Sequence, residues 1–149
     1  MPLYMIQFHQ EDIELPKLDK KKISLWVEEV AASYGKKTGQ INYIFCSEEK
    51  ILEVNKQYLN HDYFTDIISF DYSSAQNISG DLFISPFTVA SNAELLKQPF
   101  QRELHRVIIH GILHLCGFED KTSDQQTIMR KEENKALELI DITEEERSS

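Results

Sequence analysis

The stretch Arg106–Asp120 has the sequence R-V-I-I-H-G-I-L-H-L-C-G-F-E-D and is the most informative part of the chain. It is apolar on nearly every side, which is typical of a buried helix. His110 and His114 interrupt this pattern four positions apart, so their Cβ atoms should lie about 5–6 Å from each other on one helical face. Because a buried imidazole without a polar partner costs stability, each histidine must find a partner inside the fold.

The residues after this helix predict a metal site at its end. Gly117 follows His114 by three residues, where a helix often ends in a left-handed turn, and such a turn can direct Asp120 back toward the histidines. The pattern H-x-x-x-H-x-x-G-x-x-D then offers two nitrogens and one carboxylate oxygen and leaves a fourth position for water, as in catalytic zinc sites. Hydrogen-bonded core histidines with a solvated Asp120 would give the same spacing, so spacing alone leaves both interpretations open.

The spacing is also close to the H-E-x-x-H-x-x-G-x-x-H motif of metallopeptidases. In those enzymes the glutamate is the general base, and Gly111 occupies its position here. Without that proton acceptor ordinary peptidase chemistry is disfavoured, and a metallopeptidase is only a minor alternative.

Outward from this segment, the chain alternates between strand and helix patterns, without repeats or flexible linkers. We expect four strands, at residues 3–8, 41–46, 66–72 and 79–85. We expect five helices, at residues 18–37, 47–58, from 86 onward, 99–116 and from 123 onward. This order predicts an α+β fold over residues 1–149 as a single domain, with a four-stranded mixed sheet covered by about five helices. We expect the metal site at the end of the buried helix and a frayed acidic tail at residues 142–149.

Composition restricts the classes of function. The chain has 149 residues, with 16 Lys and Arg against 25 Asp and Glu, which gives a formal charge of −9. This balance argues against a protein that coats nucleic acid by bulk charge, and we expect no DNA binding. The two cysteines, Cys46 and Cys116, are too few for a disulfide framework and fit a reducing cytosol. Because no apolar run approaches the roughly 18 residues of a membrane span, we expect a cytoplasmic protein without a membrane partner.

Three motifs in the same order resemble those of the YbeY family, bacterial metal-dependent endoribonucleases and ribosomal RNA maturation factors. H-G-I-L-H-L-C-G-F-E-D at residues 110–120 is similar to that family's H-G-x-L-H-L-x-G-x-D-H. T-D-I-I-S-F at residues 65–70 resembles T-D-V-L-S-F, and G-D-L-F-I-S at residues 80–85 resembles G-D-I-x-I-S. Length and element order also agree, so the resemblance covers nearly the whole chain.

The resemblance implies one zinc ion (Zn2+) per chain. His110 and His114 match the first two ligands, and Asp120 occupies the place of the family's third histidine, with Glu119 where the family usually has Asp. A carboxylate is an acceptable zinc ligand, but its negative charge should make a bound water less acidic than three imidazoles would. No catalytic side chain is identified, and metal-bound water is expected to take that role.

The resemblance further implies a zinc-dependent single-strand endoribonuclease in ribosomal RNA maturation and small-subunit quality control. Its partners would be ribosomal RNA and, as a candidate, a ribosomal small-subunit protein. Several residues in or near the matched motifs are candidates for a substrate groove, although turn and strand-edge hydrogen bonding would explain them equally well. They are Thr65, Asp66, Ser69, Asp81, His61 and Arg106.

One departure from the family favours a different class of function. The family has an arginine after the tyrosine of its N-x-x-Y-R segment, whereas N-K-Q-Y-L places Leu59 there, so no guanidinium is available to hold a phosphate at that position. His61, Lys56, Arg102 and Arg106 are the candidate substitutes. The alternative is therefore a non-catalytic ribosome-assembly factor in which the metal stabilises the C-terminal helices.

Overall fold

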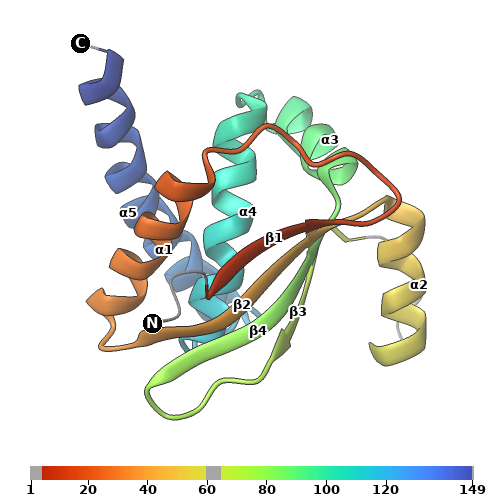
Figure 1. Cartoon of the computed structure of the whole chain (residues 1–149), viewed down its shortest axis with the longest axis horizontal. Helices are drawn as coiled ribbons and strands as arrows, with labels where there is room; N and C mark the ends of the chain where they lie inside the picture. The colour runs from red at the N-terminus through yellow and green to blue at the C-terminus, as the bar shows by residue number, and fades with distance from the viewer. Residues whose placement is uncertain (1–4, 60–64, 149) are drawn as a thin grey trace.

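The computed structural model describes the backbone of residues 5–59 and 65–148, and side chains within residues 5–58 and 65–140. Four strands and five helices are assigned within these residues (Figure 1). The strands are β1 (Ile6–Gln10), β2 (Lys37–Phe45), β3 (Ile67–Asp71) and β4 (Asn77–Ile84). The helices are α1 (Lys20–Ser33), α2 (Glu48–Leu59), α3 (Pro86–Leu96), α4 (Phe100–Leu115) and α5 (Ser123–Ser148).

The four strands form one mixed sheet in the order β1-β2-β4-β3. β1 pairs with β2, and β2 with β4, in parallel, whereas β3 pairs antiparallel with β4. β3 and β4 are joined by a short connection, as the sequence predicted, because antiparallel neighbours need no crossover helix. The predicted single α+β domain with a four-stranded mixed sheet and five helices is confirmed.

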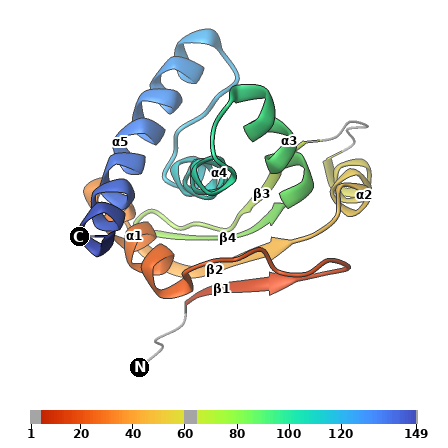
Figure 2. The same ribbon diagram turned by 90° about the horizontal axis from the view of Figure 1, so that it is seen from above.

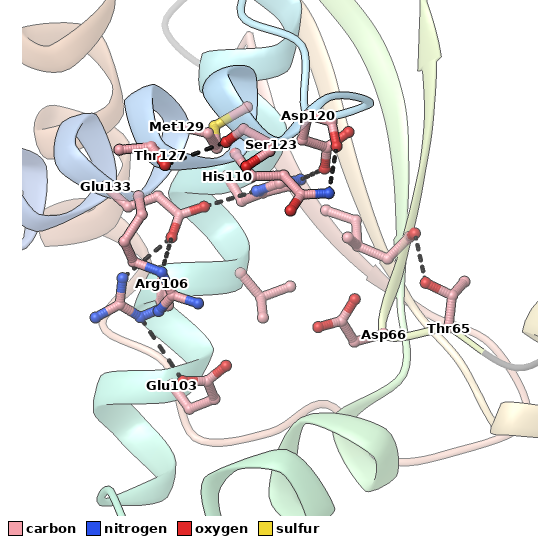
Figure 3. A pocket seen from close by; sticks show the side chains of 14 residues that line it. Thr65, Asp66, Glu103, Arg106, His110, Asp120, Ser123, Thr127, Met129 and Glu133 are labelled. Carbon is pink, nitrogen blue, oxygen red and sulfur yellow. Dashed lines mark hydrogen bonds and ion pairs between the residues drawn. The ribbon is translucent and has the colours of Figure 1, made fainter. Parts of the chain in front are cut away.

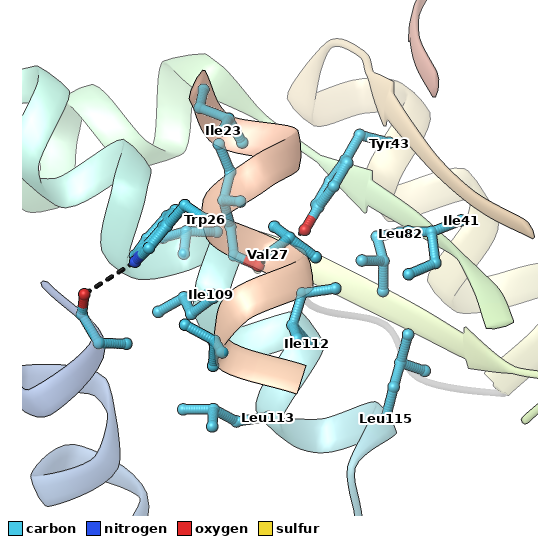
Figure 4. Close-up of a cluster of buried hydrophobic side chains, with 14 of the residues drawn as sticks. Ile23, Trp26, Val27, Ile41, Tyr43, Leu82, Ile109, Ile112, Leu113 and Leu115 are labelled. Carbon is cyan, nitrogen blue, oxygen red and sulfur yellow. Dashed lines mark hydrogen bonds between the residues drawn. The ribbon is translucent and has the colours of Figure 1, made fainter. Parts of the chain in front are cut away.

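Helix α4 lies at the centre of the helical layer (Figure 2). It packs against α3, α5, α1, β3 and β4, and ten of its residues are buried. The buried side chains of the sheet, α1, α4 and α5 form the main core (Figure 4). A smaller cluster lies between α2 and the sheet and consists of Cys46, Ile51, Val54 and Ile68.

Two hydrogen bonds from aromatic side chains fix the helices within this core. The Trp26 indole Nε1 of α1 donates to the Ala136 carbonyl of α5 at 2.8 Å (Figure 4). The Tyr43 hydroxyl of β2 donates to the Ile108 carbonyl of α4 at 3.1 Å. Because buried polar groups are costly when unpaired, both bonds constrain how α4 and α5 sit over the sheet.

Gly111 sets the distance between α4 and the sheet. A Cβ added at this position would lie 3.0 Å from Ile67 Cδ1 and 3.1 Å from Leu82 Cδ1. A glutamate here would therefore point into β3 and β4, which explains why the metallopeptidase base has no place in this fold.

The end of α4 turns as the sequence predicted. Gly117 has φ +111°, in the region that favours glycine. The Gly117 amide donates to the His114 carbonyl at 3.0 Å and the Phe118 amide to the Leu113 carbonyl at 3.1 Å, which closes the last helical turn. The chain then returns along α4, and this return places Asp120 beside His110.

Several boundaries differ from the sequence-based expectation. The first strand continues to Gln10, and residues 1–4 lie outside the described chain. The first helix ends at Ser33 instead of residue 37, because Gly35 at φ +74° turns the chain and Lys37 already begins β2. Helix α5 is assigned as far as Ser148, and the expected fraying of residues 142–149 stays a prediction.

Within residues 5–59 and 65–148, no helix is both long and apolar enough to cross a membrane.

Candidate functional site

A pocket of about 680 Å³ lies between α4, α5 and the start of β3 (Figure 3). One face of α4 contributes Glu103, Arg106 and His110, which are spaced three and four residues apart. The α5 wall is formed by its first helical turns, from Ser123 to Glu133. The opposite wall is the start of β3, with the segment Thr65–Ile67. Asp120, from the turn between α4 and α5, also lines the pocket, which therefore joins these two helices and their connection to the distant start of β3.

His110 is held between two carboxylates. Its Nδ1 lies 2.7 Å from Glu133 Oε2, and its Nε2 lies 3.3 Å from Asp120 Oδ2 (Figure 3). Burial disfavours the charged imidazole, but the hydrogen bond to Glu133 and the nearby carboxylate charges outweigh it and raise the pKa of His110. With Nδ1 donating to Glu133, Nε2 is directed toward Asp120.

Glu133 links α5 to two residues of α4. Glu133 is only 5% exposed. Its Oε1 accepts a hydrogen bond from Arg106 Nη1 at 3.0 Å, and its Oε2 is hydrogen-bonded to His110 Nδ1. Burial alone would raise the pKa of this carboxyl, but the hydrogen bonds and charges of His110 and Arg106 lower it below its ordinary value. Glu133 is therefore an ionised group that fixes the orientation of both α4 side chains.

Two other carboxyls of the pocket are less well paired. Burial raises the pKa of Asp66, even though its Oδ2 accepts a hydrogen bond from Asn92 Nδ2 at 3.4 Å. Burial also raises the pKa of Glu103, whose Oε1 is 3.8 Å from Arg106 Nε. Figure 3 shows Asp66 across the pocket from Arg106 and Glu133. The pocket thus contains carboxyl groups in two electrostatic environments, as is common at functional sites.

Two of the three predicted metal ligands lie at a separation that suits zinc. Tetrahedral bonds of about 2.0–2.2 Å place two ligand atoms about 3.3–3.6 Å apart. His110 Nε2 and Asp120 Oδ2 are 3.3 Å apart, which is longer than an ordinary N–H···O hydrogen bond. Glu133 also supplies the carboxylate partner that metal-binding histidines commonly have on their other nitrogen.

His114 is not brought into this group. It is half-buried one turn further along α4, and its imidazole makes no hydrogen bond or ion pair within the described part of the chain. Across residues 5–58 and 65–140, no three His, Cys, Asp or Glu side chains converge closely enough to hold a metal ion. The structure therefore brings His110 and Asp120 together without His114, and metal binding by His110, His114 and Asp120 stays a prediction.

The predicted groove residues divide into two groups. Thr65, Asp66 and Arg106 line the pocket, and the Thr65 hydroxyl also donates to the Ile67 carbonyl at 3.4 Å. Ser69 and Asp81 do not line it.

The position of Asp81 follows from strand alternation. Gly80 and Leu82 face α4, so Asp81 points to the other face of the sheet, where its Oδ1 accepts from Asn42 Nδ2 at 3.1 Å. His61 lies outside the described residues, as does the side chain of Leu59 at the end of α2.

The sequence reasoning missed Glu133, Glu103 and Arg130. The signal for Glu133 was present: it falls among Met129, Ala136 and Ile140 at helical spacing, on the buried face of α5. A charged residue at a buried position requires a partner, and its partners here come from α4.

Comparison with known proteins shows the relatives of this chain. A family model described as "Endoribonuclease YbeY" matches residues 5–141. The protein named "Endoribonuclease YbeY" of Phocaeicola vulgatus is 60% identical over 138 residues, which cover 93% of this chain and all of that protein. Its namesake from Parabacteroides distasonis is 58% identical over 135 residues, covering 91% of this chain and 95% of that protein.

A solved structure agrees with the fold. The solution structure of TM1509 from Thermotoga maritima has a TM-score of 0.62 and 29% sequence identity, and the match covers 96% of this chain and 92% of that one. The family match spans nearly all of the sequence, and it includes the α4 segment, the turn at Gly117 and the part of α5 that carries Glu133. On these grounds, the chain belongs to the endoribonuclease YbeY family.

Proposed function

We propose that this chain is an endoribonuclease, a hydrolase that cleaves phosphodiester bonds within single-stranded RNA during ribosomal RNA processing. The family match and the names of its relatives support cleavage of RNA. The pocket between α4, α5 and β3 supports the location of the chemistry, because it gathers carboxyls, guanidinium groups and an oriented imidazole. The observation that carries the proposal is the His110 imidazole held between Glu133 and Asp120.

We assign one zinc ion per chain to His110, His114 and Asp120. Support comes from the 3.3 Å separation of His110 Nε2 and Asp120 Oδ2 and from the i, i+4 placement of His114 on the same helix. When bound, the ion supplies positive charge that makes a water molecule more acidic and polarises a phosphoryl oxygen.

The side chains of this chain provide orientation and proton transfer. Glu133 holds the Nδ1 proton of His110, so that Nε2 carries the lone pair that faces the pocket. Asp66 lies across the pocket, and its raised pKa favours a role in accepting and returning a proton during cleavage.

The acidic charge of the chain suggests how the substrate is chosen. A formal charge of −9 disfavours tight unassisted binding to RNA, so we propose that a small-subunit ribosomal protein brings the enzyme to ribosomal RNA for small-subunit quality control. Both cysteines are free thiols, which supports a reducing cytoplasmic setting. Tight binding of purified protein to structured ribosomal RNA at physiological salt, without any partner, would contradict this targeting.

Metal content and RNA cleavage measured on the same preparations test the proposal. We expect the wild type to contain zinc and to cleave single-stranded RNA, and His114→Ala to lose both. His9→Ala is the matched control, because His9 lies on β1 and contacts Asn42 outside the pocket. Cleavage that persists unchanged in His114→Ala would indicate a contaminating ribonuclease and would remove the support for this site.

The same measurements distinguish the assembly factor. That alternative is favoured by Leu59, which offers no guanidinium at the end of α2. Zinc bound by a wild-type protein that never cleaves RNA would identify the metal as structural and the chain as a non-catalytic assembly factor.

A further inference from the structure

The two arginines of the pocket have different surroundings. Arg106 is 15% exposed in its side chain, and its Nη1 lies 3.0 Å from Glu133 Oε1. Its Nε also lies 3.8 Å from Glu103 Oε1, so this guanidinium is engaged on two sides by buried carboxylates. A substrate anion could bind Arg106 only by competing with these internal partners.

Arg130 is exposed at the edge of the same pocket. Its side chain is 57% exposed, and its contact with Glu133 is a long one, with 4.0 Å between Nε and Oε1. The charge of Arg130 also acts on Glu103, where it opposes the burial that raises the pKa of that carboxyl. In the part of the chain that the structure describes, the Arg130 side chain makes no hydrogen bond. Its planar set of N–H donors therefore remains available for a ligand, and a guanidinium can bind two oxygens of one phosphate at once.

Arg130 lies close to the His110 imidazole, with only the Glu133 carboxylate between them. Glu133 lies between the two groups: its Oε2 bonds His110 Nδ1 at 2.7 Å, and its Oε1 faces Arg130 Nε at 4.0 Å. Arg130 thus lies one carboxylate away from the predicted metal ligand, on the α5 wall of the pocket.

The charge of the pocket favours such a cation at its edge for an anionic substrate. Four carboxyl groups line it, and one of its two guanidinium groups is already paired internally. The carboxyl groups belong to Asp66, Glu103, Asp120 and Glu133. A phosphodiester strand that enters this pocket meets these carboxylates, and a guanidinium at the edge offsets part of their charge in addition to the proposed zinc ion.

We propose that Arg130 binds a phosphate of the RNA strand next to the phosphodiester that is cleaved, and so positions the strand across the pocket. This inference rests on the proposed function, because it takes RNA as the substrate. It assigns to α5 a direct role in binding the substrate, in addition to the support that Glu133 gives to His110.

The test measures binding of an eight-nucleotide single-stranded 2′-O-methyl RNA, whose integrity is checked after each titration. We expect Arg130→Gln to weaken binding about 10-fold at 0.1 M salt and to reduce the slope of log affinity against log salt by about 0.7, the value for one phosphate of a single strand. Arg130→Lys should recover part of the affinity, since it keeps the charge but loses the planar pair of donors.

Lys131→Gln is the matched control, because it removes the same charge from the neighbouring exposed position of α5, outside the pocket lining. We expect it to change the affinity less than twofold. Thermal unfolding of each variant checks that the α5 wall stays folded. Equal weakening by Arg130→Gln and Lys131→Gln, or an unchanged salt slope in Arg130→Gln, would overturn the proposal.

Cleavage of unmodified RNA by the wild type, assayed in parallel, separates this proposal from the proposed function. A wild type that does not cleave, but whose binding depends on Arg130, would contradict the nuclease and support the phosphate site. If the wild type cleaves RNA but Arg130→Gln binds RNA as well as the Lys131→Gln control does, the nuclease is supported and the phosphate site at Arg130 is contradicted. No detectable binding by the wild type would overturn the assignment of Arg130.

Discussion

The side of α4 that faces the sheet and the side that lines the pocket contain different kinds of side chain. Toward the sheet, Gly111 allows contact with Ile67 and Leu82, and the neighbouring residues are fully buried and apolar. Toward the pocket, the same helix presents His110 and Arg106, which are engaged with carboxylates from other segments. The two sides are adjacent on the helix, since His110 and Gly111 are consecutive residues.

This difference separates stability from function within one helix. Apolar burial on the sheet side stabilises the fold, whereas each charge buried on the pocket side must be offset by a partner. We therefore expect substitutions on the sheet side to unfold the protein, and substitutions on the pocket side to alter binding and chemistry with smaller effects on folding.

The largest expected effect is on the sheet side. Gly111→Val should reduce the free energy of unfolding by about 3 kcal/mol, because its side chain would overlap Ile67 and Leu82. Gly111→Ala, which adds only the Cβ, should cost less. Urea denaturation measures both. A valine variant within 0.5 kcal/mol of the wild type would show that α4 does not pack as tightly here as the structure indicates.

On the pocket side, Glu133→Gln should weaken zinc binding about 10- to 100-fold, because His110 loses the carboxylate that orients it. Glu132→Gln is the control: the adjacent Glu132 contacts Tyr34 and not His110. Competition with a chromophoric chelator gives both affinities. If the two variants bind zinc equally well, Glu133 does not support the metal site.

A third contact joins the end of α1 to α5, where the hydroxyl of the C-cap residue Tyr34 donates to Glu132. Tyr34→Phe should lower the free energy of unfolding by about 1 kcal/mol at pH 7. The hydrogen bond from Tyr34 lowers the pKa of Glu132 below the 4.5 of an unperturbed group, so its contribution is present above pH 4.5 and is lost as the pH falls through the folded-state pKa.

The difference between Tyr34→Phe and the wild type should therefore shrink in acid. Denaturation at pH 7 and at pH 3 checks this. A difference that stays constant between the two would mean that the carboxylate charge contributes nothing to the contact.

The smallest expected effect has the opposite sign. Burial raises the pKa of Glu103, so the cost of its charge appears as the pH rises through the folded-state pKa. Glu103→Gln should therefore raise the stability at neutral pH by about 0.5 kcal/mol, with little gain in acid. Thermal unfolding at both pH values measures it. Destabilisation at neutral pH would show that the pairing of Glu103 with Arg106 outweighs its burial.

Local sequence signals predicted most of the fold. Apolar residues alternate with others in residues 41–46 and 79–85, and they recur at helical spacing around Trp26. Both patterns arise because one face of the element is buried, and each is visible within a short stretch of sequence. Gly117 was recognised as the turn after α4 because a left-handed backbone favours glycine. The end of α5 was harder to predict, since a solvated acidic segment can be helix or coil.

The candidate site was only partly predictable for a physical reason. The spacing of His110 and Asp120 is set by one helix and one turn, so it is visible in the sequence. Glu133 approaches His110 from another helix, 23 residues away, and that contact depends on how α5 packs against α4. Asp81 was placed in the groove by its motif, but strand alternation directs it to the opposite face of the sheet.

The central claim is that one zinc ion is held jointly by His110, His114 and Asp120. Anomalous diffraction at the zinc edge, from crystals grown with one equivalent of zinc, tests it most directly. We predict a single peak about 2.0–2.2 Å from a nitrogen of each histidine and from an Asp120 oxygen, with Glu133 on the far side of His110. A peak at other residues, or His114 pointing away from a zinc held by His110 and Asp120, would contradict the claim.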